Sequence, residues 1–239
     1  MAAIILMVVV TAGFGAAKFL DEKLEIVGGT MRPGTATGQT LEGVYNFRTI
    51  GIDDKMKTGL LWRSTRLAAA TPEDISHLAK LLRGGVVIDL RTAIERRLSP
   101  DPEIPNVLNK SFPISGAASA GSYVAAFVKN AGDRATFGRA LTAIANAGGK
   151  VLIHCTYGKD RTGWLVAMIM YSLGANDNQV MTEYLRSNGQ VKGASVNRTW
   201  LNAALRAARQ KYGSIDGYIR DGLGVSGGTL AKLRAKFAE

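Results

Sequence analysis

Two short apolar runs, at residues 86–88 and 151–153, are the clearest signal in the pattern of hydrophobic and polar positions along the chain. Each run follows a glycine pair and a stretch with helical spacing, and each ends in polar residues. Short apolar runs that lie between turn residues are typical of buried strands. Because a helical stretch precedes each strand, the pattern predicts an α/β fold in which helices flank a central sheet.

Further elements follow from the same periodicity. Thr71 and Pro72, followed by two acidic residues, form a typical helix start, and the apolar positions after them share one helix face. Two more strands are predicted at 60–64 and near 107–112. Helices are predicted at 71–83, 123–147 (with an interruption at 132–133), 161–173, 176–187, 197–212, 215–220 and 229–237. The C-terminal third of the chain is therefore predicted to be helical.

Residues 1–17 contain no charged side chain, and three interpretations of them compete. A membrane anchor needs about 17–25 apolar residues, so this run lies at the short limit. A signal peptide fits the length and the small residues at 15–17 but lacks a basic start. The third interpretation is a buried helix or strand. We expect residues 1–20 to be a signal peptide or membrane anchor, which would place the protein in the periplasm, outside the cell or at the inner membrane; a cytoplasmic location is the alternative.

The charged and glycine-containing segment at 21–40 is typical of a linker, which leaves residues 41–239 as one folded domain. A chain of 239 residues is long enough to bury a substantial core. Its single cysteine excludes an internal disulfide framework, and with only two histidines it cannot form a Cys/His zinc cluster. A zinc site of this kind is therefore not expected.

The net charge of +11 favours anionic partners, although a solvated basic surface would have the same composition. The basic residues are dispersed along the chain, without a Lys/Arg block or an aromatic-basic repeat. This pattern gives no support to nucleic-acid binding. The charge alone is thus weak support for an anionic substrate.

The run at 151–153 leads directly into the only cysteine, and the most specific part of the sequence follows it. Residues 154–163 read His-Cys-Thr-Tyr-Gly-Lys-Asp-Arg-Thr-Gly. A loop between a strand and a helix N-terminus directs backbone N–H groups at one point and forms an anion site. The helix end and Arg161 both favour the thiolate form of Cys155. A phosphate held in this loop would have its nucleophile directly beneath it.

Each residue type in the loop has a use in the hydrolysis of a phosphate monoester. Cys155 would attack phosphorus and form a phosphocysteine. Arg161 would bind two phosphoryl oxygens through its planar guanidinium, and Thr162 would stabilise the sulfur as a leaving group. The substrate-binding part of the loop is expected to consist of Thr156, Tyr157, Gly158 and Lys159.

A general acid is also required, to protonate the departing oxygen and then to activate water. Asp160 is the nearest carboxyl group in the sequence, and it could equally cap the following helix. Its competitors for the acid role are Asp89, Asp101 and Asp133.

Other residues near the loop have both a functional and a structural interpretation. Asp89 and Arg91 follow the strand at 86–88, so they face the same site as Cys155 or form a structural ion pair, and the sequence does not decide between the two. Lys159 would bind a second anionic group or be merely solvated. His154 is expected to support the loop by hydrogen bonding, and Gly163 to allow close backbone approach.

The loop resembles the signature of the protein tyrosine phosphatase superfamily, and more narrowly that of bacterial tyrosine/serine phosphatases whose loop has the Gly-Lys-Asp-Arg-Thr-Gly form. The resemblance covers roughly residues 41–237. Further matching positions occur in the family's order: Asn46-Phe47-Arg48 with Gly51, Arg63-Ser64 with Leu67, Asp89-Leu90-Arg91 with Glu95, Glu183-Tyr184-Leu185 with Ser187-Asn188, and Tyr212-Gly213-Ser214 with Leu223-Gly224.

The resemblance implies a phosphatase fold for residues 41–239 and hydrolysis through a phosphocysteine, with no metal and no cofactor. It also implies that Asp160 is the general acid. Other members of the superfamily take this acid from a mobile Trp-Pro-Asp loop, and this sequence contains no Trp-Pro-Asp. The resemblance also implies a phosphorylated protein or a phosphoinositide as substrate, with Lys159 matching the loop lysine associated with that breadth. Two positions depart from the family pattern. Thr49 replaces a common Asp, and Tyr157 replaces a small residue and would reshape the mouth of the pocket.

Phosphotyrosine is the expected substrate, with phosphoserine and phosphothreonine as further candidates. The alternatives are a phosphoinositide phosphatase that uses the same loop and a non-catalytic phosphate-binding module. A rhodanese-like sulfur transferase also presents a cysteine on a turn, but the Arg-Thr-Gly that leads into a helix argues against it. Arsenate reduction would need further cysteines, which the chain does not have.

Overall fold

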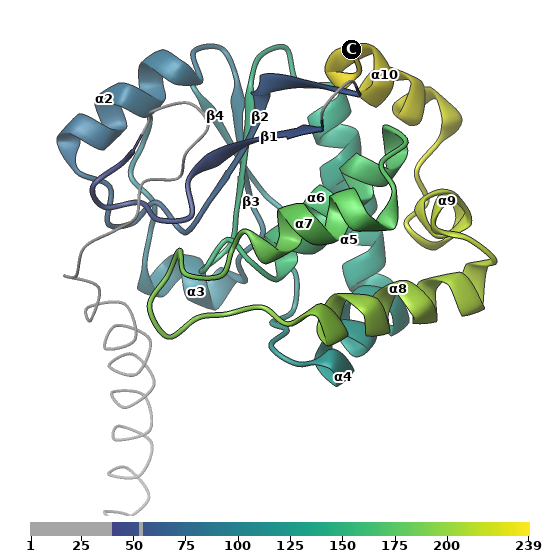
Figure 1. The fold of residues 1–239 in the computed structure, drawn as a ribbon. Coiled ribbons are helices and arrows are strands. Elements are labelled where there is room, and N and C mark those ends of the chain that lie inside the picture. The colour runs from purple at the N-terminus through teal and green to yellow at the C-terminus, as the bar shows by residue number, and fades with distance from the viewer. Residues whose placement is uncertain (1–39, 53–54) are drawn as a thin grey trace, which may run out of the picture.

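A five-stranded sheet with the strand order β1-β2-β5-β3-β4 forms the centre of the computed structural model, which describes residues 40–52 and 55–239 (Figure 1). Strands β2, β5, β3 and β4 run parallel, and β1 pairs antiparallel with β2. The strands are β1 (Arg48–Ile52), β2 (Met56–Ser64), β3 (Val86–Asp89), β4 (Leu108–Ser111) and β5 (Val151–His154).

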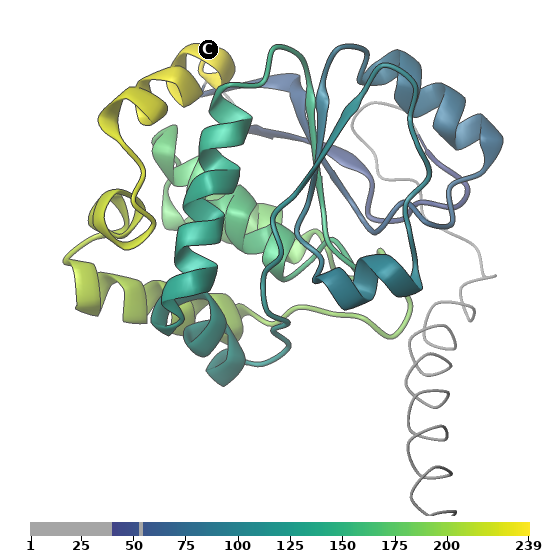
Figure 2. The same ribbon diagram turned by 180° about the vertical axis from the view of Figure 1, so that it is seen from behind.

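Helices cover both faces of this sheet. Because alternate residues of a strand point to opposite faces, the residues of the central strands are buried on both sides. Leu152 of β5 packs with Trp62 and Val87 in a cluster that includes Leu78 of helix α2. Its neighbours on the strand, Val151 and Ile153, belong to the main core with the other helices. Figures 1 and 2 show α2 on one side of the sheet and α5 on the other.

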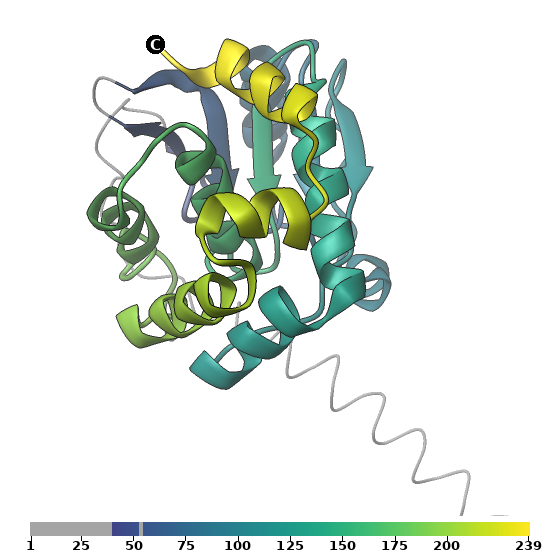
Figure 3. The ribbon, with the colours of Figure 1, turned by 90° about the vertical axis from the view of Figure 1, so that its right-hand side faces the viewer.

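The helices, in chain order, are α2 (Pro72–Leu81), α3 (Ala93–Leu98), α4 (Ala120–Tyr123), the π-helix η1 (Val124–Lys129), α5 (Ala131–Ala145), α6 (Arg161–Ser172), α7 (Asp177–Leu185), α8 (Arg198–Tyr212), α9 (Ile215–Gly217), the π-helix η2 (Tyr218–Gly222) and α10 (Gly227–Phe237). From α6 onward the chain forms helices and their connections, without a strand, as Figure 3 shows for the packed C-terminal helices. The predicted α/β class, with its flanked sheet and helical C-terminal third, is confirmed.

Helix α6 lies in the middle of the core and begins at the end of the cysteine loop. Every residue of α6 except Tyr171 is buried. Its Trp164 stacks on Phe127 of η1 at 5.5 Å between ring centroids and donates a hydrogen bond to the Tyr218 hydroxyl. A helix that is apolar on all sides is fixed by its surroundings, so the loop ahead of it has a rigid base.

The structure differs from the predicted elements at one strand and in two helical regions. Strand β1 at Arg48–Ile52 was not predicted. The break in the helical segment 120–145 falls at Asn130, whose backbone is extended and whose side chain accepts a hydrogen bond from the backbone N–H of Asp133. We predicted the break at 132–133, because glycine there suggested it. Helix α3 was not predicted at all, although Thr92 and Glu95 form a capping box at its start.

The expected anchor or signal peptide at 1–20, and the linker at 21–40 except for its last residue, lie outside the described residues. Within the described residues, no helix has the length and apolar character needed to cross a membrane.

Candidate active site

The cysteine loop emerges at the carboxyl edge of the central strand. His154, the last residue of β5, pairs with Ser64 at the end of β2 and with Asp89 at the end of β3. Residues 155–160 then turn, and α6 begins at Arg161. The carboxyl edge of parallel strands is where ligands bind in α/β sheets, and the helix start adds backbone N–H groups and a partial positive charge.

Cys155 lies at the bottom of this loop and is only 2% exposed. Burial by itself would raise the pKa of its thiol, but the Arg161 charge and hydrogen bonds from the Thr162 hydroxyl and backbone N–H outweigh it and lower the pKa below the usual value. The Thr162 side chain is fully buried, and no nitrogen or oxygen atom of the described residues is a partner of its hydroxyl. The Cys155 sulfur is therefore the group with which this hydroxyl interacts.

The Arg161 guanidinium is held in place by Glu95 of α3. Its two terminal nitrogens donate to the two carboxylate oxygens of Glu95 at 2.7 Å each, which is a bidentate ion pair. Burial disfavours both charges, but the pairing prevails: it lowers the pKa of Glu95 to about 2 and raises that of Arg161. The Thr156 hydroxyl also donates to Glu95. Glu95 thus fixes two residues of the loop.

Asp160 is the last loop residue before α6. It is only 7% exposed and is surrounded by polar groups. Its Oδ1 accepts a hydrogen bond from the Tyr123 hydroxyl, which in turn lies 2.8 Å from the Tyr184 hydroxyl. Lys159 Nζ contacts both carboxylate oxygens of Asp160, at 2.9 and 2.8 Å, and lies 5.5 Å from the centre of the Trp200 ring. Lys159 is therefore an internal partner of Asp160 and not a solvated side chain.

A second group of residues holds the loop backbone through hydrogen bonds to the Gly158 carbonyl. The Gly158 carbonyl accepts hydrogen bonds from Arg63 Nη2 at 2.5 Å and from Asn46 Nδ2 at 3.0 Å. Arg63 is itself paired with Glu183 of α7 at 3.1 Å, and so is Arg48 at 2.8 Å. Because these charged groups are buried and paired with each other, they give the loop a fixed support.

Gly158 has a backbone φ of +62°, and a Cβ atom at this position would lie 2.0 Å from the Ser64 carbonyl oxygen. We therefore expect Gly158→Ala to lower the free energy of unfolding by more than about 2 kcal/mol and to abolish most activity, because the loop must move away from β2. Gly174→Ala is the matched control: its φ is +82°, but nothing lies within 4 Å of the added atom. Thermal unfolding and initial rates measure both effects, and equal losses in the two variants would contradict this account.

His154, Asp89 and Arg91 form a buried network behind the loop. Arg91 donates to Asp89 at 2.9–3.2 Å and to Asp101 at 2.6 Å. His154 is fully buried; its Nδ1 lies 3.3 Å from the Cys155 carbonyl oxygen and its Nε2 lies 3.1 Å from Asp101. Burial opposes the charged imidazole, but the two carboxylates outweigh it and raise the pKa of His154.

This network gives Asp89 and Arg91 the arrangement of a structural ion pair, one of the two interpretations that the sequence left open. Each is 1% exposed, and their charged groups pair with one another. The contact of His154 with the Cys155 carbonyl is a geometry in which the expected support of the loop is possible, and that role stays a prediction. Asp89, Asp101 and His154 could surround a cation by geometry alone. Because Arg91 occupies both carboxylates, this cluster does not fit a metal.

The remaining candidates are placed as follows. Asp133, near the start of α5, accepts hydrogen bonds from Ser115, and Asp101 accepts one from the Leu67 backbone N–H. Of the carboxyl groups considered for the acid role, Asp160 is the one that belongs to the loop. Thr49 bridges the β1–β2 hairpin through the Gly59 N–H and the Leu61 carbonyl. Tyr157 is half-buried within the loop.

Glu95, Tyr123 and the Arg63–Glu183 pair have roles that the residue pattern did not predict. The available signals were the capping box before Glu95 and the charged residues inside β1 and β2, where apolar side chains are the norm. Tyr123 had no local signal, because its partner Asp160 lies 37 positions away in the sequence.

Comparison with known proteins places this arrangement in a family. The family model described as "Tyrosine phosphatase family" matches residues 39–239, which is most of the chain. The chain belongs to this family. The resemblance on which the sequence analysis relied is thereby confirmed for the tyrosine phosphatase family as a whole.

Two curated relatives agree with the tyrosine phosphatase family. One is a putative tyrosine-protein phosphatase from Cupriavidus necator, to which the chain is 31% identical over 117 residues. This match covers 39% of the chain and 41% of the relative. The other is the triple specificity protein phosphatase PtpB from Mycobacterium tuberculosis, to which the chain is 30% identical over 129 residues. This match covers 40% of the chain and 46% of PtpB. The matched regions thus span less than half the length of either relative. A solved structure, TpbA from P. aeruginosa, covers 74% of this chain and 96% of its own at 16% identity, with a TM-score of 0.42.

Proposed function

We propose that this member of the tyrosine phosphatase family hydrolyses phosphate monoesters through a phosphocysteine on Cys155. The observation that carries the proposal is the loop itself, which combines a buried thiol of lowered pKa with an arginine fixed by Glu95 at a helix N-terminus. A dianionic phosphoryl group would be bound by the loop N–H groups and Arg161, since developing charge is best stabilised by fixed donors. No step requires a metal.

In the first step the Cys155 thiolate would form a bond to phosphorus while the bond from phosphorus to the leaving oxygen breaks. Protonated Asp160 would give its proton to that oxygen. In the second step Asp160, now a carboxylate, would take a proton from water as the water oxygen attacks phosphorus. The sulfur would leave as a thiolate, which the Thr162 hydroxyl stabilises, and the enzyme would be restored with inorganic phosphate as product.

Phosphotyrosine is the proposed first substrate, and phosphoserine, phosphothreonine and phosphoinositides are the further candidates. The support for the broader range is Lys159, whose Nζ is held by Asp160 beside the loop and could turn to a second anionic group. PtpB, to which part of this chain is similar, is named a triple specificity phosphatase. Association of the protein with a membrane or an export route through residues 1–20 also stays a proposal.

The test is phosphate release by the full chain in the presence of a chelator. The substrates are an aryl phosphate, phosphotyrosine, phosphoserine and phosphothreonine peptides, and vesicles that contain phosphoinositides. We expect turnover that vanadate inhibits, with the aryl ester and phosphotyrosine fastest. Turnover only on addition of a divalent metal, or tight phosphate binding without release, would overturn the proposal, the latter in favour of a phosphate-binding module.

Tyr123 is predicted to position Asp160 for proton transfer, because its hydroxyl donates to the carboxylate from a buried site. The loss of a hydrogen bond to such a charged group corresponds to roughly a 10- to 100-fold change. We expect Tyr123→Phe to lower kcat/KM by about 10-fold for alkyl and other poor leaving groups, and far less for nitrophenyl phosphate. Asp160→Asn should show the same dependence more strongly.

The matched control for this substitution is Tyr171→Phe, which removes a hydroxyl that donates to Asp177 on the surface. It should leave the leaving-group dependence unchanged. If Tyr123→Phe lowered the rate equally for good and poor leaving groups, Tyr123 would act on the fold of the loop and not on proton transfer.

A further inference from the structure

A cavity lined by both apolar and basic side chains lies at the opposite edge of the sheet from Cys155. Its volume is about 530 Å³, and it is formed by the middle of β2, the start of β5 and the ends of α2 and α5, with α10 as its remaining wall. The side chains and backbone that line it are Leu60, Leu81, Arg83, Ala145, Ala147, Gly148, Gly149, Lys150, Lys232, Ala235 and Lys236. Because β5 runs from this edge to the cysteine loop, the cavity is separate from the candidate active site.

Every charged side chain in this lining is a cation. Arg83 follows α2, Lys150 precedes β5, and Lys232 and Lys236 lie one turn apart on α10. Within the described residues, none of the four forms an ion pair with a carboxylate. A concave surface with charge of a single sign concentrates the electrostatic field and attracts ions of the opposite sign.

The two lysines of α10 are held in fixed positions by the turn between α5 and β5. Lys236 Nζ donates to the carbonyls of Ala147 and Gly149, the latter at 2.7 Å, and Lys232 Nζ donates to Asn146 Oδ1 at 2.7 Å. An ammonium group has three donors, so donors remain on both. Partial burial lowers the pKa of Lys236.

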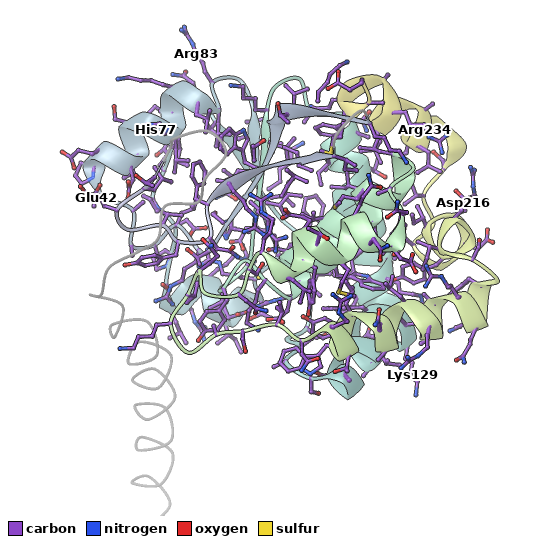
Figure 4. All side chains as sticks on the ribbon, in the orientation of Figure 1. Glu42, His77, Arg83, Lys129, Asp216 and Arg234 are labelled. Carbon is purple, nitrogen blue, oxygen red and sulfur yellow. The ribbon has the colours of Figure 1, made fainter. Side chains whose placement is uncertain are left out.

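The negative end of the α5 helix dipole explains the positions of some of these cations but not of all four. Lysines near the last carbonyls of a helix are favourable by themselves, and Lys232 and Lys236 serve the end of α5 in this way. Arg83 and Lys150 have no hydrogen-bond or ion-pair partner within the described part of the chain. Figure 4 shows Arg83 projecting outward from the end of α2. Two cations with hydrogen-bond partners and two without therefore line the same cavity.

We propose that this cavity binds a compact ligand that carries two or more phosphate groups. Four cations match the charge of such a ligand, the remaining ammonium and guanidinium donors match its oxygens, and Leu60, Leu81 and the alanines can contact its carbon skeleton. A free polyphosphorylated metabolite and the headgroup of a phosphorylated lipid share this chemistry. The site is independent of hydrolysis at Cys155.

The test uses the full chain and the double variant Arg83→Glu/Lys150→Glu, which reverses the two charges that have no role in capping. The probes are inorganic tripolyphosphate in solution and phosphatidylcholine vesicles with and without phosphatidylinositol bisphosphate. The loop also binds phosphate, so each probe is titrated against Arg161→Ala protein, in which binding in the loop is weakened. In that background we expect the double variant to bind at least about 10-fold more weakly, and higher salt to weaken the binding of the parent protein.

The matched control is Lys129→Glu/Lys211→Glu, which makes the same change in net charge at exposed positions outside the cavity. It should bind like the parent. Binding of tripolyphosphate supports a soluble ligand, and binding only to vesicles with the bisphosphate lipid supports a headgroup. The proposal is overturned if neither probe binds, or if the control weakens binding as much as the cavity variant. Arg83→Gln/Lys150→Gln replaces the double variant if charge reversal impairs folding, and it should then bind more weakly than Lys129→Gln/Lys211→Gln.

Discussion

Replacement of Cys155 by serine is expected to lower kcat for an aryl phosphate by at least about 10⁴-fold, as is usual when a nucleophile is removed. A serine hydroxyl has nearly the same size as the thiol, but the surroundings that lower the thiol pKa cannot ionise it at neutral pH. The loop, Arg161 and the helix N-terminus stay in place, so the variant should still bind phosphate and vanadate.

Rates of phosphate release and the binding of inorganic phosphate by the same protein measure the two effects separately. A serine variant that lost binding as well as turnover would indicate a collapsed loop and would need Cys155→Ala as a second variant. Retention of more than a few per cent of the activity in either variant, with the fold intact, would mean that Cys155 is not the nucleophile.

Arg161→Lys is expected to lower kcat by roughly 10²- to 10³-fold, the usual range for the loss of a group that stabilises the transition state. The guanidinium donates one N–H of each terminal nitrogen to Glu95, and its remaining N–H groups can donate to the phosphoryl oxygens. An ammonium group has one centre and cannot do both. Steady-state kinetics with an aryl phosphate measure the loss.

Two further variants show whether the loss at Arg161 depends on its orientation. Glu95→Gln removes the charge of the carboxylate that fixes Arg161, and we expect a smaller loss in the same direction. Arg209→Lys changes a half-exposed arginine that pairs with Asp177 on the surface, so it should leave kcat unchanged. Wild-type kinetics in Arg161→Lys would contradict the role of the guanidinium.

The part of the fold that could be predicted from sequence is the part with a local signal. The apolar runs at 86–88 and 151–153 are the central strands, and the helix after the loop begins at Arg161 as expected. The cysteine loop is also local, since its residues are consecutive. The motif therefore indicated a thiol, an anion site and a helix start within ten residues.

What the sequence left undecided depends on contacts between distant segments. Glu95 reaches Arg161 from 66 positions away, and Arg63 reaches Glu183 from 120 positions away. Periodicity contains no information about such pairings. The ion pair of Asp89 and Arg91 was undecided for the same reason: only the position of Asp101 and His154 behind the loop shows which way the two side chains point.

The most direct test of the proposed mechanism is the detection of the phosphocysteine itself. Rapid acid quench of the full chain during turnover of an aryl phosphate, followed by mass spectrometry of its peptides, should find one phosphoryl group on Cys155. Thr162→Ala should increase its amount, because the sulfur then leaves more slowly in the second step. Turnover without a phosphoryl group on Cys155 in either protein, or with one on another residue, would contradict the mechanism.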